Sequence, residues 1–212
     1  MPLHKIEKIN STRFLALWHI DESYQDLFEA VKKETDEYTM LSTFRHEDKK
    51  KEWLAGRLTI MALCQKLNLT YHGVIKDEHG KPYLKNCDAE ISLSHSYPYV
   101  SILLDLKTDV GIDLEQKKAK LIKVQHKFLT EEEAENANNA IEKLGVYWCA
   151  KEALYKICSS EKLSFKDNIR IAPFDLDTQG KLFGKIIVNG ITKSYQLEYR
   201  VEENYILAFN ID

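Results

Sequence analysis

The sequence lacks any apolar run long enough to cross a membrane, and residues 1–10 carry charges without the apolar core of a secretion signal. It also lacks an excess of positive charge, since its net charge is −3 and gives a polyanion no overall attraction. Its four cysteines include no C-x-x-C pair, which argues against a disulfide framework or a zinc site. These absences predict a cytoplasmic protein with reduced thiols that binds neither membranes nor nucleic acid.

The composition is that of an ordinary folded protein. Of the 212 residues, 44% are hydrophobic and 30% are charged. This length allows one large domain or two small halves. The order of the expected elements is strand, helices, strands, helices, strands, which is typical of an α+β fold. We therefore predict an N-terminal α+β half over residues 1–109 and a C-terminal α+β half over residues 110–212.

Hydrophobic periodicity and capping residues predict the elements of the first half and the entry to the second. Strands are expected over 13–20, 91–96, 99–106 and 110–115, and helices after Asp21 or Ser23 and over 46–67. The last three strands are close in sequence, so an antiparallel meander is the economical topology.

The second half is predicted to be helical first and β-rich afterwards. Helical segments are expected over 124–128, from Thr130 and over 148–156, and strands over 169–172, 181–188, 194–201 and 205–209. Thr130 and Glu133 have the spacing of a capping box, which gives Glu133 a plain structural role. Asn189-Gly190 is a strong signal for a β-hairpin.

Two carboxylates stand out at the start of the second half. Side chains of a strand alternate between its faces, so Asp113 and Glu115 point the same way, while Val110, Ile112 and Leu114 point into a core. Two carboxylates on one face repel each other unless a cation or a proton lies between them. Oxygen ligands of this kind suit Mg2+, and the alternative is a solvated acidic strand edge.

Other candidates each have a structural alternative. Ser94 and His95 end a strand, where they either cap a loop or bind phosphate, and no G-x-S-x-G motif supports a nucleophilic serine. Arg57 lies in an apolar helical stripe, from which it either extends to the surface or binds an anion. Glu152 and Lys156 lie four residues apart and could form a simple helical ion pair.

Taken together and in order, these motifs resemble those of the 4′-phosphopantetheinyl transferase superfamily, in its larger surfactin-synthetase-activating type. The matching residues are Gly80-Lys81-Pro82, Leu93-Ser94-His95-Ser96, Val110-Gly111-Ile112-Asp113-Leu114-Glu115, Phe128-Leu129-Thr130 with Glu133, and Trp148 with Lys151-Glu152-Ala153-Leu154-Tyr155-Lys156. The resemblance covers residues from about 44 to 156, and its last two motifs are the most specific.

The resemblance implies two similar α+β halves related by a pseudo-twofold axis, with coenzyme A in the cleft between them. It implies transfer of the phosphopantetheine group to a serine of an apo carrier protein of fatty acid, polyketide or nonribosomal peptide synthesis, with release of adenosine 3′,5′-bisphosphate. Competing hypotheses are a Mg2+-dependent hydrolase of nucleotide pyrophosphates and a non-catalytic module that binds carrier proteins. A chain with both halves is expected to act as a monomer.

The resemblance also implies roles for individual residues. Asp113, Glu115 and Glu152 would hold Mg2+, and Glu133 or Glu152 would take the serine proton. Residues implied in binding coenzyme A are Arg57, Lys81, Pro82, Ser94, His95 and Lys156.

The sequence departs from the family pattern in one segment. Residues 34–42 contain none of the basic residues that hold the 3′-phosphate in such proteins, so Arg45, Lys49, Lys50, Lys51 or Arg57 would have to substitute. For the acidic carrier protein, we expect a docking surface formed by the lysines after Glu115 and the aromatic residues around Phe128.

Overall fold

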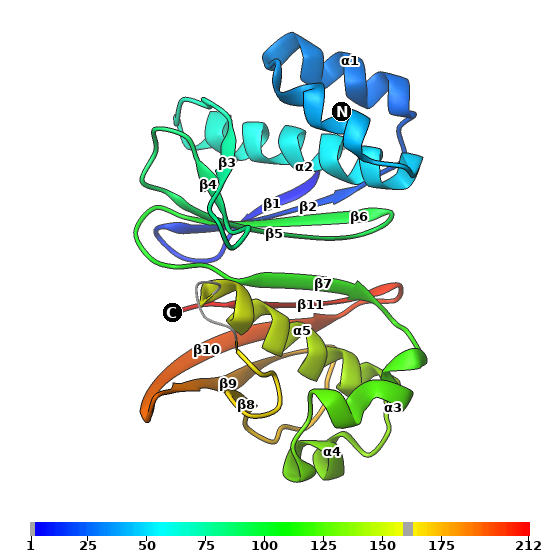
Figure 1. Ribbon diagram of the computed structural model, residues 1–212, viewed down its shortest axis with the longest axis vertical. Coiled ribbons are helices and arrows are strands. Elements are labelled where there is room, and N and C mark those ends of the chain that lie inside the picture. The colour runs from blue at the N-terminus through cyan, green and yellow to red at the C-terminus, as the bar shows by residue number, and fades with distance from the viewer. Residues whose placement is uncertain (1–2, 159–162) are drawn as a thin grey trace. The chain divides into compact units, whose positions relative to one another are not determined.

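The computed structural model describes residues 3–158 and 163–212 and divides the chain into two compact units, Met1–Asp109 and Val110–Asp212. Each unit has its own antiparallel sheet and its own helices (Figure 1). Among the described residues, every helix is too short or too polar to cross a membrane. The four cysteines are free thiols, of which Cys64 and Cys149 are buried and Cys87 and Cys158 are partly exposed.

The first unit is built on a six-stranded sheet in the order β1-β2-β6-β5-β4-β3. Its strands are β1 (Leu3–Lys8), β2 (Arg13–His19), β3 (Val74–Lys76), β4 (Pro82–Leu84), β5 (Glu90–Ser96) and β6 (Tyr99–Asp105). Ala16, Trp18, Val100 and Ile102 are almost completely buried in the core of this unit, and β6 is buried at every position from Val100 to Asp105.

Helices cover one face of this first sheet. They are α1 (Tyr24–Glu34), the 3-10 helix η1 (Glu37–Thr43) and α2 (Glu47–Lys66), and α2 packs on β2, β5 and β6 (Figure 1). Ser23 caps α1 because its side chain accepts a hydrogen bond from the Asp26 amide, 3.2 Å away. The apolar face of α2, including Leu54, Ile60 and Leu63, is completely buried.

The second unit is built on a five-stranded sheet in the order β7-β11-β10-β9-β8. Its strands are β7 (Ile112–Gln116), β8 (Ile169–Ile171), β9 (Gln179–Val188), β10 (Ile191–Val201) and β11 (Tyr205–Asn210). The predicted hairpin is confirmed: β9 and β10 pair, and both Asn189 and Gly190 between them have positive φ, 49° and 78°.

One long helix organises the second unit. The helices are α3 (Lys120–Val124), the 3-10 helix η2 (Gln125–Lys127), α4 (Glu131–Ala137) and α5 (Ile141–Ile157), and α5 lies across the sheet on β7 and β11 (Figure 1). Gly111 permits this approach, because a Cβ there would overlap the carbonyl oxygen of Ala153 in α5. The start of β7 is therefore held close to the C-terminal half of α5.

The predicted three-stranded meander is wrong. β5 pairs with β6 as expected, but β7 pairs with β11, nearly a hundred residues later in the chain. Proximity in sequence favours neighbouring strands, yet here the chain leaves one sheet after β6 and starts the edge of another. The predicted helical turns at 124–128 also begin earlier, at Lys120.

Candidate functional site

The acidic strand β7 presents its two carboxylates to α5. Asp113 pairs with Ala208 and Glu115 with Ile206 across the ladder, and both partners belong to the core beneath α5. Asp113 is 5% exposed, whereas Glu115 is partly exposed. The predicted alternation therefore holds, and Asp113 and Glu115 lie on one face of the strand.

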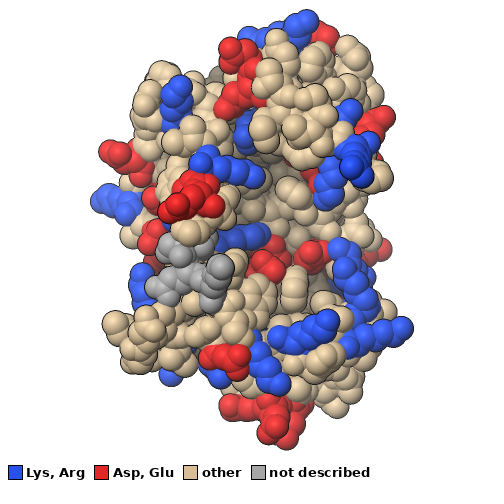
Figure 2. All heavy atoms as spheres, in the orientation of Figure 1, with Lys and Arg blue, Asp and Glu red and all other residues tan. Residues whose placement is uncertain are grey.

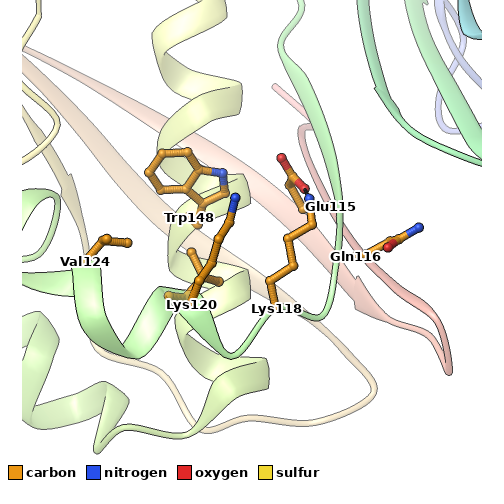
Figure 3. Close-up of a pocket in the computed structure, with 7 residues that line it drawn as sticks. Glu115, Gln116, Lys118, Lys120, Val124 and Trp148 are labelled. Atoms are coloured by element: carbon orange, nitrogen blue, oxygen red, sulfur yellow. Dashed lines mark hydrogen bonds and ion pairs between the residues drawn. The ribbon is translucent and has the colours of Figure 1, made fainter. Parts of the chain in front are cut away.

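Lys156 of α5 closes on this face. Its Nζ donates to the Asp113 carboxylate at 2.7 Å and to the Ile112 carbonyl at 2.8 Å. Glu115 accepts from Lys118 Nζ at 2.6 Å, and the close-up in Figure 3 draws these two side chains beside the wall of a pocket. Each carboxylate of β7 is thus matched by an ammonium group.

Glu152 belongs to the same group of charges. Burial raises the pKa of Glu152 to about 7, the negative charges of Asp113 and Glu115 add to the rise, and Lys156 opposes it. A carboxyl with this pKa is half-protonated near neutral pH, and a nearby cation would stabilise its ionised form. The structure therefore brings together four predicted residues: Asp113, Glu115, Glu152 and Lys156.

The donor set can be tested for its fit to a metal ion. Three carboxylates are a hard oxygen set of the type that Mg2+ takes, and the charges of Asp113 and Glu115 add to the burial that raises the pKa of Glu152. Among the described residues, however, no three His, Cys, Asp or Glu side chains lie close enough together to hold a metal. The residue types fit Mg2+, and Asp113 and Glu115 would have to exchange their lysine partners for the ion.

Glu133 lies in a different, fully buried network. Its side chain is 2% exposed and completes a capping box with Thr130, so the structural interpretation of this residue is confirmed. One oxygen accepts from Thr130 N and from Lys151 Nζ, at 2.9 and 2.7 Å, and the other accepts from Ile171 N at 2.9 Å. Both oxygens are therefore occupied by the protein itself.

Lys151 holds this network together. It is completely buried, and its three N–H groups are shared among four acceptors at 2.7–2.9 Å, the Glu133 carboxylate and the carbonyls of Phe128, Phe165 and Ile169. Burial lowers its pKa to about 8, against the opposing effect of the Glu133 charge. Lys151 thus ties α5 to the end of η2, to α4 and to β8.

A small pocket of about 180 Å³ adjoins Glu115 (Figure 3). Leu121, Val124 and Trp148 give it an apolar wall, and Lys118 and Lys120 extend along it. Basic side chains also gather on the surface over α3 (Figure 2), where Lys120 and Lys123 are exposed. Phe128 itself is only 2% exposed and packs edge-on against Trp148, which lines the pocket.

The first unit has a larger pocket, of about 470 Å³, between α2, η1 and the sheet. It is lined by three of the predicted binding residues, Arg57, Pro82 and His95. The pocket also has an apolar side with Met40, Phe44, Val74 and Leu93.

Two acidic residues of this pocket, Glu37 and Glu52, pair with basic side chains that also line it. Glu37 lies 3.4 Å from Arg57 Nε, and the guanidinium of Arg57 stacks over Trp53 at 4.6 Å. Glu52 lies 3.1 Å from His95 Nδ1 and 2.6 Å from Lys49 Nζ. Within the described residues 34–42, the segment without basic residues thus contributes a carboxylate, Glu37, to the cavity.

The remaining predicted residues lie apart from this pocket. Lys81 is paired with Glu90 and Asp109, both at 3.2 Å. Ser94 is 7% exposed on β5. Neither Lys81 nor Ser94 is among the described residues that line the pocket, although both adjoin residues that do.

The geometry can now be set beside known proteins. Residues 109–210 match the 4′-phosphopantetheinyl transferase superfamily. No curated protein matches the chain. The matched segment covers the second unit and contains Asp113, Glu115, Glu133, Glu152 and Lys156, whereas the pocket of the first unit lies outside it.

Three residues of these sites were missed by sequence reasoning. Lys151 lies within the superfamily motif around Glu152, but nothing in its neighbours indicates complete burial. Glu52 follows a run of charged residues that reads as a solvated helix face. Glu37 is the first residue of the short 3-10 helix η1, in which only Leu41 is buried. In each case the partner is distant in sequence, so only the fold reveals it.

Proposed function

We propose that the chain transfers the 4′-phosphopantetheine group of coenzyme A to a serine of an apo carrier protein and releases adenosine 3′,5′-bisphosphate. The observation that carries this proposal is the grouping of Asp113, Glu115, Glu152 and Lys156 inside the segment that matches the superfamily. Phosphoryl transfer depends mainly on positioning and on neutralising charge, and this group of side chains serves both needs.

Glu152 is the proposed general base. A base has to lie beside the reacting groups, and Glu152 lies with Asp113, Glu115 and Lys156, where the pyrophosphate is proposed to bind. Glu133 was the other candidate, but a carboxylate that is 2% exposed and bonded through both oxygens does not reach a substrate hydroxyl. In this scheme the carrier serine gives its proton to Glu152 as its oxygen attacks the phosphorus.

Asp113, Glu115 and Glu152 are the proposed Mg2+ ligands. When bound, the ion would neutralise charge on the pyrophosphate of coenzyme A. Lys156, now 2.7 Å from Asp113, would turn its ammonium group to the phosphate and stabilise the charge that develops on it. Asp113 and Glu115 would then be paired with a cation both before the ion binds, through their lysines, and after it binds.

The pocket of the first unit is the proposed site for the phosphate-bearing end of coenzyme A. Lys49 offers positive charge and His95 offers a ring nitrogen at one side of it, and Met40, Phe44 and Val74 offer apolar contact to a base. Arg57 contributes less charge than expected, because Glu37 lies against its guanidinium.

The test is to incubate the chain with coenzyme A, Mg2+ and a panel of apo carrier proteins and to measure the carrier mass. The proposal requires a gain of one phosphopantetheine group on at least one carrier. A parallel reaction without carrier identifies the competing hydrolase, since only that enzyme would release adenosine 3′,5′-bisphosphate rapidly. Binding of carrier without any mass gain would instead show a non-catalytic module.

A further inference from the structure

The most completely buried carboxylate of the pocket in the first unit is Glu52, whose side chain is 1% exposed. A buried charge is costly unless partners satisfy it. Tyr97 N donates to one oxygen at 2.9 Å, and Lys49 Nζ and His95 Nδ1 approach the other at 2.6 and 3.1 Å. Burial alone would raise the pKa of Glu52, but its bonds to His95 and Lys49 hold that pKa below the ordinary value.

This arrangement fixes the histidine ring. An Nδ1 atom that faces a carboxylate carries the proton, and the bond sets the orientation of the ring about its side chain. Nε2 is then the ring nitrogen that faces a ligand, and because phosphate oxygens only accept hydrogen bonds, Nε2 also carries a proton when it binds a phosphate. His95 is 41% exposed and lines the pocket, so a ligand there can reach it.

The same oxygen that holds His95 also holds Lys49, so an ammonium group and the histidine ring lie at one side of the pocket. The other charged groups lining the pocket are Arg57, Lys76 and Glu37, and Glu37 is already engaged by Arg57, Tyr71 and the amide of Val74. Both acidic residues of the pocket are therefore bonded to donors of the protein, and a ligand meets mainly donors.

We propose that Glu52 is a positioning residue, which directs Nε2 of His95 toward a phosphate group of the ligand and keeps Lys49 beside it. The inference rests on the proposed use of coenzyme A, but it assigns a new role to a residue outside the segment that matches the superfamily. A purely structural Glu52 would satisfy Tyr97 N and Lys49 without controlling the proton on His95.

The test compares Glu52→Gln with a matched control, Glu47→Gln, which removes the same charge from an exposed position of α2. Nitrogen NMR of the His95 ring, recorded in the full chain where the ring is neutral, should show the proton on Nδ1 in the wild type and in the control. In Glu52→Gln the proton should move largely to Nε2. With coenzyme A, Glu52→Gln should raise KM about tenfold and change kcat less than twofold. The neutral ring of the variant donates from Nε2 without the charge that Glu52 stabilises in the doubly protonated, phosphate-bound ring, and losing that charge assistance weakens binding by about that factor.

Parallel assays with 3′-dephospho-coenzyme A identify the phosphate: a KM effect confined to coenzyme A assigns the 3′-phosphate, and an equal effect on both assigns the pyrophosphate. An unchanged proton position, or a fall in kcat with KM unchanged, overturns the proposal. If the wild type does not use coenzyme A, the proposed function fails, while the ring spectrum still decides the role of Glu52. If Glu52→Gln does not fold, a neutral wild-type ring that carries its proton on Nε2 is sufficient to refute the positioning role of Glu52.

Discussion

Replacing Lys151 with methionine tests whether the Glu133 carboxylate belongs to the folded scaffold of the second unit. Methionine has a similar length but removes the ammonium group that donates to Glu133 and to three backbone carbonyls. Both residues are buried, Lys151 completely and Glu133 to 2% exposure, so no water replaces the lost bonds. We therefore expect the full cost of leaving a buried charge without its ionic partner.

That cost is about 3–5 kcal/mol for breaking one side of a buried ion pair. A domain is stable by only about 5–15 kcal/mol, so the variant should lose a large part of the stability of the second unit. Urea unfolding should be followed at pH 6, below the pKa of about 8 of Lys151, so that the ammonium is charged in the wild type. Trp148 reports the second unit, with Trp18 and Trp53 replaced by phenylalanine to remove the signal of the first unit.

Two further variants make the result specific. Lys123→Met removes an exposed lysine of the same unit and should change the unfolding free energy by less than about 0.5 kcal/mol. The double variant Lys151→Met with Glu133→Gln removes both charges and should recover part of the loss, because no unpaired charge remains. A loss below about 1 kcal/mol in Lys151→Met would refute the scaffold role and return Glu133 to the candidates for the general base.

Two other predictions concern Glu152 and the basic surface over α3. Between about pH 4.5 and 7, the metal-free chain should lose stability as the pH rises, because the raised pKa of Glu152 makes the folded state bind more protons than the unfolded state. Glu152→Gln should remove most of this dependence on pH. Mg2+ should stabilise the wild type near pH 8 in thermal unfolding, but it should not stabilise the variant. Equal stabilisation of both proteins would contradict the metal assignment. The double variant Lys120→Glu with Lys123→Glu should raise KM for the carrier protein in steady-state kinetics and leave KM for coenzyme A unchanged. Exposed charges at the edge of an interface act mainly on the rate at which the two proteins associate. An unchanged KM for the carrier would place the docking surface elsewhere.

Local patterns predicted much of the second unit. Strand alternation correctly placed Asp113 and Glu115 on one face, and the Thr-x-x-Glu spacing correctly predicted the cap formed by Thr130 and Glu133. Both signals depend on residues a few positions apart, which the sequence displays directly. The position of α5 over β7 could be expected only from the family resemblance, because it joins segments about forty residues apart.

Pairings between distant segments were beyond local reasoning. The partner of β7 is β11, and its register depends on a sheet assembled from the end of the chain. The burial of Phe128 depends on Trp148 and on Lys151, two residues of α5 that lie about twenty positions later in the chain. Glu52 looked like part of a solvated charged run, and only its contacts with His95 and Tyr97 show why a carboxylate is buried there.

The proposed function is tested most directly by loading an apo carrier protein with wild type, Asp113→Ala and Glu152→Ala. Each reaction contains coenzyme A and Mg2+, and the carrier mass is read over time, with Glu132→Ala as an exposed acidic control in the same unit. We expect the wild type and the control to add one phosphopantetheine group to the carrier serine, and the other two variants to add none. Loading by Asp113→Ala and Glu152→Ala at the wild-type rate would contradict the assignment of the site.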